Sequence, residues 1–183
     1  EDLIKASNGE IMLDSTAGGI TNNGTLDAAQ GSIEMVAAGD IETMGNLTAA
    51  YLKERAAAFR IGGEYHVGQS FHDNLDDAIT YAANTNVSGT INDIANIVIN
   101  AGVTVTLDGD TIFRADYDEA NPGSESDGTG AFLMDETASI VGQTNDLTIQ
   151  ASEASTLGNL SGIGVLTLDR TNASWTPTYT ADP

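Results

Sequence analysis

The sequence predicts a mainly β chain that folds as a right-handed parallel β-helix (a solenoid) with an inserted or capping helical segment. Three observations predict this fold. A repeat of about 21 residues occupies the amino-terminal part. The apolar residues are mostly Ala, Val, Ile and Leu, and only 5% of the chain is aromatic, which suits thin stacked layers better than one bulky core. Gly and Asn recur at equivalent positions of the repeat, where turns are needed.

Each unit of the repeat contains three short strand patterns separated by Gly, Asn or Asp. Three pairs of segments match: 9–13 with 31–35, 17–20 with 38–41, and 23–28 with 44–49. Because one unit is too short to bury its own apolar face, we expect successive coils to stack about 4.8 Å apart with parallel backbones. This stacking would place Ile11 over Ile33 and Leu13 over Met35. Residues 1–50 are therefore predicted to form solenoid coils.

Residues 49–90 depart from this repeat and are predicted to form a helical cap or junction. Residues 49–60 are rich in good helix formers. Residues 73–83 begin with Asp73 as a candidate N-cap and carry apolar residues on one helical face. A cap would belong to one stack of coils, whereas a junction would separate two stacks, and the sequence leaves both arrangements open.

Strand patterns return in residues 91–175, which are predicted to form further coils. An acidic, turn-rich segment, 108–130, is predicted to leave the stack as a loop. Residues 176–183 are predicted to be a linker or a cut terminus of something longer, since Thr and Pro dominate them.

The charge of the chain limits its partners. It contains 27 acidic and 6 basic residues, a formal net charge of −21. Such a surface repels phosphate backbones and anionic lipids, so we expect no nucleic-acid binding. No apolar run reaches the ~20 residues of a membrane helix, so no membrane insertion is expected either. The absence of cysteine excludes disulfides and thiolate ligands, and the negative charge attracts cations.

Residues 20–41 carry an Asn-x-Gly-Thr-Leu-x-Ala step followed by a Gly-Ser-Ile-x-Met step. This pattern resembles the repeats of filamentous-haemagglutinin-type secreted adhesins, most clearly over residues 9–50. The resemblance implies a long, exported, right-handed β-helical protein at the bacterial cell surface, and it transfers no catalytic or binding residue. Residues 73–107 are similar to the entry of pectin-lyase-like β-helices, in which a helix often caps the open end.

The acidic loop holds the candidate metal site. Its oxygen-bearing side chains are candidate Ca²⁺ ligands: Asp116, Asp118, Glu119, Asn121, Glu125 and Asp127. The spacing matches neither the EF-hand nor the glycine-rich calcium repeat. The alternative is a solvated loop that its charge keeps soluble. No other cofactor is predicted.

The two histidines are the other candidate ligands. His66 and His72 could pair with Asp73 or Glu64, but their spacing is not a recognised one, and isolated histidines are commonly structural. We therefore favour a structural role for both.

Catalysis is not expected. Enzymes that cleave polysaccharides on a β-helix need clustered carboxylates with a basic partner. Arg114 lies near Asp108 and Asp110 in the sequence, yet basic residues are scarce, and a lone Arg among acids usually offsets their repulsion. No catalytic residue is predicted.

These observations predict a non-enzymatic extracellular structural or adhesive segment of a surface protein. One version is a self-assembling fibre or sheath subunit that strand stacking extends. The expected partners are other copies, neighbouring segments of the same long protein, and host or surface glycans. The alternative is a carbohydrate-binding or carbohydrate-active (lyase- or hydrolase-like) β-helix protein of the cell surface.

Overall fold

The computed structural model describes residues 3–74, 78–118, 128–153, 155–169 and 180–181, and each regular element in them is a β-strand. All the strand pairings are parallel. The strands are β1 (Leu3–Lys5), β2 (Glu10–Ser15), β3 (Ile20–Asn22), β4 (Thr25–Ala37), β5 (Ile41–Thr43), β6 (Asn46–Ala56), β7 (Phe59–Asn74), β8 (Ala78–Asp93), β9 (Asn96–Ile99), β10 (Thr104–Arg114), β11 (Phe132–Met134), β12 (Ser139–Val141), β13 (Leu147–Gln150), β14 (Asn159–Ser161), β15 (Leu166–Asp169) and β16 (Thr180–Ala181). The mainly parallel-β solenoid predicted from the sequence is therefore confirmed.

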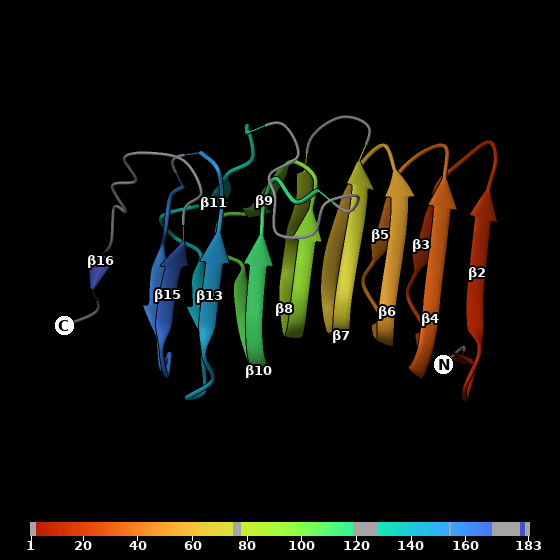
Figure 1. The fold of residues 1–183 in the computed structure, drawn as a ribbon, viewed down its shortest axis with the longest axis horizontal. Coiled ribbons are helices and arrows are strands. Elements are labelled where there is room, and N and C mark those ends of the chain that lie inside the picture. The colour runs from red at the N-terminus through yellow and green to blue at the C-terminus, as the bar shows by residue number, and fades with distance from the viewer. Residues whose placement is uncertain (1–2, 75–77, 119–127, 154, 170–179, 182–183) are drawn as a thin grey trace.

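The strands form a single stack of coils that runs from the N-terminal β2 to the C-terminal β15 (Figure 1). Each coil contributes to three walls, which we call A, B and C. Wall A starts with β1 and continues through the first part of β4 and the first part of β6. Wall B starts with β2 and continues through the second part of β4 and the second part of β6. Wall C starts with β3 and continues through β5. The long strands β7 and β8 turn two corners and contribute to all three walls.

The repeat sets the register between coils. Ile11 pairs with Ile33 and Leu13 with Met35, as the repeat predicts. Each wall carries an inward-facing row of residues that are in register from coil to coil: Leu26, Leu47, Tyr65, Val87 and Leu107 in wall A; Ile11, Ile33, Leu52, Ser70, Ile91 and Phe113 in wall B; Ile20, Ile41, Phe59, Ile79, Ile97 and Phe132 in wall C. Stacking these rows buries apolar surface that no single coil could bury.

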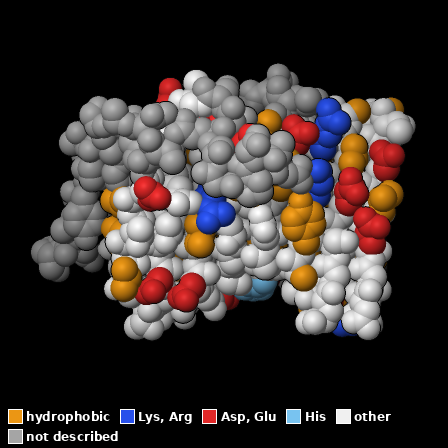
Figure 2. Space-filling view, in the orientation of Figure 1, with side chains coloured by type: hydrophobic (Ala, Val, Ile, Leu, Met, Phe, Trp, Pro, Cys, Tyr) orange, Lys and Arg blue, Asp and Glu red, His pale blue; other side chains and the backbone are white. Residues whose placement is uncertain are grey.

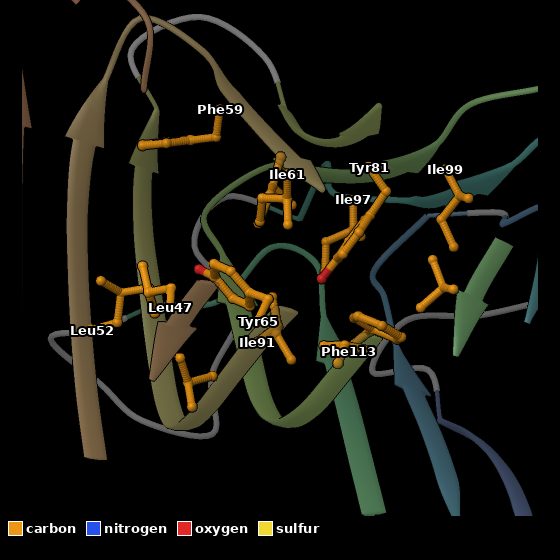
Figure 3. Close-up of a cluster of buried hydrophobic side chains, with 14 of the residues drawn as sticks. Leu47, Leu52, Phe59, Ile61, Tyr65, Tyr81, Ile91, Ile97, Ile99 and Phe113 are labelled. Atoms are coloured by element: carbon orange, nitrogen blue, oxygen red, sulfur yellow. The ribbon is translucent and has the colours of Figure 1, made fainter. Parts of the chain in front are cut away.

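The core lies inside the tube formed by the three walls. Figure 3 shows side chains of β6, β7, β8, β9 and β10 pointing toward one another across this interior. Aromatic rings fill the widest part, where the Tyr81 and Phe113 rings lie 5.8 Å apart and the Phe113 and Phe132 rings 5.4 Å apart. Ring pairs at such distances stabilise a core beyond the area that they bury.

The predicted helices are wrong. Residues 49–60 belong to β6 and the start of β7, and the described part of 73–83 belongs to β7 and β8, while 75–77 lie outside the described residues. In β6, Leu52, Glu54 and Ala56 are buried, and Tyr51, Lys53 and Arg55 between them are more exposed. This alternation fits a strand against stacked neighbours, which overrides the helix propensity of Ala, Leu, Glu and Lys.

The boundaries of the predicted regions change accordingly. Residues 49–90 continue the solenoid, so the chain has one stack and no helical junction in the part that the structure describes. The acidic loop does not begin at residue 108, because β10 extends to Arg114. Thr180 and Ala181, which were predicted to lie in a linker, pair with Asn159 and Leu160.

Glycines at the corners allow the coils to approach closely. A Cβ on Gly45 would lie 2.1 Å from the Gly24 carbonyl oxygen of the previous coil, although Gly45 has no positive φ. Glycine is therefore needed at this corner for the close approach of the two coils, and not for a left-handed backbone. Gly89 meets both demands, with φ of 100° and a Cβ position 1.5 Å from the Val67 carbonyl oxygen.

We expect Gly89→Ala to destabilise the protein more than Gly102→Ala. Gly102 also has a positive φ, of 69°, but a Cβ there meets nothing within 4 Å. Its substitution should cost about 1 kcal/mol of backbone strain, whereas Gly89→Ala adds a steric clash of about 1–3 kcal/mol. Urea unfolding followed by circular dichroism measures both, and equal losses would contradict the close-approach argument.

Candidate functional site

The first coil, formed by β1, β2 and β3, leaves one backbone edge open. β1 and β2 pair with β4, and β3 pairs with β5, but the opposite edges of these strands meet no other strand in the described residues. We call this surface the open edge.

The open edge also has an apolar hollow. The hollow measures about 850 Å³, and its lining includes Ile4, Leu13 and Ile20, which continue the inward-facing rows of the three walls. Met12 and Ile4 are 62% and 47% exposed. The end of the solenoid thus presents unpaired backbone and uncovered core residues on one surface.

The opposite end of the solenoid also has exposed apolar residues, beside a smaller hollow. Val165 and Leu166, at the start of β15, are 58% and 36% exposed. A hollow of about 270 Å³ lies beside them, lined by Leu160, Ile163 and Leu166 among others. β15 pairs with β13 and with no further strand in the described part of the chain.

Two basic side chains of the outer surface form ion pairs between adjacent coils. Lys5 pairs with Asp27, and the Arg55 Nε atom lies 3.4 Å from an Asp73 oxygen; both pairs join strands that are neighbours in the stack. In Figure 2 a short column of basic groups lies over β6, with acidic groups next to it over β4 and β2, and another basic group lies nearer the middle of the stack. Cross-strand pairs of this kind offset part of the repulsion between stacked acidic coils.

The predicted Ca²⁺ ligands of the acidic loop are not brought together by the described structure. Glu119, Asn121, Glu125 and Asp127 lie outside the described residues. Asp116 is buried, and its Oδ2 atom accepts hydrogen bonds from the Gly128 amide, at 2.9 Å, and the Ser152 hydroxyl. Its carboxylate therefore joins the two ends of the loop. Asp118 is half-buried, and its interactions leave it with a partner already. The Ca²⁺ site stays a prediction.

The two histidines lie in different environments and do not form the pair considered from the sequence. His66 lies on the outer side of wall A, where its Nε2 atom is 3.1 Å from Glu64 Oε2 and 3.8 Å from Asp108 Oδ2. These three side chains could hold a metal ion, since their ligand atoms all lie within 4.8 Å of one another. Sequence reasoning noted Glu64 as a partner of His66 and missed Asp108, which is two coils away along the stack.

His72 points into the core and lies in a row of ionisable residues. The row that begins with Leu13 and Met35 continues in register with Glu54, His72 and Asp93, and all three are at most 1% exposed. Sequence reasoning missed this row, because the strand that carries Glu54 was predicted to be a helix. The alternation of buried positions in β6 and β7 is the signal that would have revealed it.

Hydrogen bonds satisfy the buried imidazole on both sides. The Nδ1 atom of His72 lies 2.9 Å from the Asn92 carbonyl oxygen, to which it donates. The Nε2 atom lies 2.9 Å from Glu54 Oε2 and 2.8 Å from the Tyr65 hydroxyl, and that hydroxyl donates to Glu54 at 3.3 Å. Asp93 accepts a hydrogen bond from the Ala95 amide at 2.7 Å. A charged imidazole therefore has an acceptor for each of its two N–H groups.

The pKa shifts follow from this arrangement. Burial alone lowers the pKa of His72, but the hydrogen bond to Glu54 and the negative charges of Glu54 and Asp93 outweigh it, so the pKa of His72 is raised above its usual value. Burial and the nearby Glu54 charge raise the pKa of Tyr65 well above its ordinary range, so its hydroxyl stays a donor. The row is an acid–base–acid arrangement held within an otherwise apolar core.

Arg114 is not a partner of the nearby aspartates. Its Nε atom donates to Gln150 Oε1 in the next coil, and it forms no ion pair with Asp108 or Asp110. Asp110 accepts a hydrogen bond from the Asp146 amide at 3.0 Å. These contacts join coils, as do the ion pairs of Lys5 and Arg55.

The raised pKa of His72 predicts a pH dependence of stability. A group with a raised folded pKa stabilises the fold below its unfolded pKa, and this contribution is lost as the pH rises through the folded pKa. The free energy of unfolding should therefore fall as the pH increases from about 6.5, where ordinary carboxylates are already ionised. Urea unfolding across this range should show a smaller slope for His72→Gln. A wild-type slope in His72→Gln would contradict the assignment.

Comparisons with known proteins give no relative. No protein-family model matches the chain, and neither a curated protein nor a solved structure matches it. In the described residues no helix is long and apolar enough to span a membrane.

Proposed function

We propose that this chain is a non-enzymatic structural or adhesive segment of an extracellular bacterial surface protein, and that it is extended by further coils stacked on its open edge. The observation that carries the proposal is the combination, on the first coil, of an unpaired parallel edge and a hollow lined by the core rows. The occupant is a coil of the same repeat, from a neighbouring segment or from a second copy. The resemblance of residues 9–50 to secreted adhesins supports the extracellular location.

The hydrogen-bond pattern of β2 supports this choice of occupant. In a parallel pair, alternate residues of a strand bond to the same neighbour. The Gly9 and Ser15 carbonyls accept from the amides of Ser32 and Ala38 in the next coil. Met12 is one of the residues that alternate with these, so its amide and carbonyl point away from β4, to the open side. Another parallel strand can continue the ladder there without rearrangement.

The apolar rows support the same occupant. Leu13 and Ile20 are partly buried and join the core cluster, whereas their counterparts in the next coil, Met35 and Ile41, are at most 1% exposed. A further coil with aliphatic residues in register would complete this burial, at about 25 cal/mol per Å² of apolar surface removed from water. A globular partner with an irregular surface would neither form hydrogen bonds with the unpaired backbone of β2 nor bury the apolar rows.

A substitution at Met12 tests the proposal. Met12→Pro removes the amide that faces the open side and leaves the bonds between β2 and β4 in place, because proline is tolerated on an edge strand. Met12→Ala removes the side chain and keeps the amide. We expect the wild type and Met12→Ala to assemble end to end at high concentration, and Met12→Pro to remain monomeric.

Sedimentation velocity and negative-stain electron microscopy measure the assembly, with far-ultraviolet circular dichroism as the check of folding. Equal assembly of Met12→Pro and Met12→Ala would show that the open edge is not the contact. A wild-type chain that remains monomeric at high concentration would contradict assembly between copies.

A further inference from the structure

Three side chains from two different coils converge on the outer side of wall A. Glu64 and His66 are alternate residues of β7, and Tyr65 between them is fully buried, so both flanking side chains point outward. Asp108 follows Leu107 in β10, and β8 separates β7 from β10. His66 Nε2 nevertheless lies 3.8 Å from Asp108 Oδ2.

Small and polar residues of β8 make this convergence sterically feasible. Ser88 is in register with His66 in the intervening coil, and its short side chain leaves the space over which His66 and Asp108 meet. The His66 Nδ1 atom lies 3.0 Å from the Ser88 hydroxyl. The Asn86 amide donates to Glu64 Oε1 at 3.1 Å and so directs the other oxygen, Oε2, toward His66. β8 thus orients both residues of β7, as outer-shell groups do in metal sites.

The cluster has an excess of acceptors over donors. When Nδ1 carries the imidazole proton and donates to Ser88, Nε2 presents a lone pair to two carboxylate oxygens. Glu64 and Asp108 have no ion pair with Lys or Arg in the described part of the chain. Asp27 and Asp73, by contrast, each form an ion pair with a basic residue of the adjacent coil. In this tautomer the cluster offers three acceptor atoms to a cation from solution.

We propose that Glu64, His66 and Asp108 form a Zn²⁺ site with three protein ligands and a fourth position open to solvent. A mixed imidazole and carboxylate set suits Zn²⁺, whereas Ca²⁺ and Mg²⁺ prefer oxygen ligands alone. Tetrahedral bonds of about 2.0–2.1 Å place ligand atoms about 3.3 Å apart. The distances of 3.1 and 3.8 Å from Nε2 to the two carboxylates lie on either side of this value.

The site is accessible and joins coils that share no hydrogen bonds. The side chains of His66, Glu64 and Asp108 are 30%, 42% and 33% exposed, so an ion can enter from solvent. Bound Zn²⁺ would connect β7 to β10 across β8 and would neutralise two carboxylates that lie two coils apart. Zinc thus stabilises the middle of the stack, independently of what covers the open edge.

The test titrates Zn²⁺ into the intact 183-residue chain by isothermal titration calorimetry, in about 150 mM sodium chloride with millimolar Ca²⁺ present. The salt and Ca²⁺ occupy the diffuse atmosphere of this acidic protein, so heat from a specific site remains. We expect one saturable site in the wild type. His66→Ala and Asp108→Asn should each weaken its affinity at least about tenfold, and Ser88→Ala should weaken it less.

Glu136→Gln is the matched control, because it removes one exposed carboxylate from elsewhere on the surface and should leave the affinity unchanged. Thermal unfolding gives a second readout, in which Zn²⁺ raises the melting temperature of the wild type and of Glu136→Gln, but not that of His66→Ala. Zinc binding that survives His66→Ala, or that Ca²⁺ abolishes, would overturn the proposal in favour of general electrostatic binding. No saturable binding to a folded wild type would also overturn it.

Discussion

The parallel hydrogen-bond ladder between coils is the interaction on which the rest of the structure depends. A coil of about 21 residues has too little apolar surface to hold a conformation alone, so its order comes from the coils above and below. The ladder also fixes which side chains meet, because register and alternation decide what points inward. Glycine corners such as Gly45 and Gly89 are needed because the ladder brings backbones so close there.

The ladder places ionisable residues as strictly as aliphatic ones. Glu54, His72 and Asp93 continue the row of Leu13 and Met35, so three coils have a polar core position where their neighbours have an apolar one. Taking such groups out of water costs energy, which the hydrogen bonds that they form offset. Aliphatic side chains can pack against one another in several registers, whereas Glu54, His72 and Asp93 lie opposite one another in one register only. We infer that it specifies the alignment of β6, β7 and β8.

The register between coils also decides which charged side chains meet on the outer surface. The chain has many more acidic than basic residues, so the available Lys and Arg residues are too few to pair with all the acids of the stacked coils. At Lys5 and Arg55, an ion pair with an acid in register joins adjacent coils. Glu64 and Asp108 have no ion pair with Lys or Arg in the described residues, and both carboxylates lie beside His66. The zinc proposal and the extension at the open edge thus both arise from stacking.

The amino-acid sequence was sufficient to predict the solenoid, the pairing of Ile11 with Ile33, and the recurrence of corner glycines, because these follow from a short repeat that local patterns reveal. It could not determine the state of residues 49–60, since Ala, Leu, Glu and Lys favour a helix until neighbouring coils supply a ladder. The meeting of His66 with Asp108 and of His72 with Glu54 was likewise decided by the tertiary structure. The physical reason is that these partners are distant in sequence, and only the register between coils brings them together.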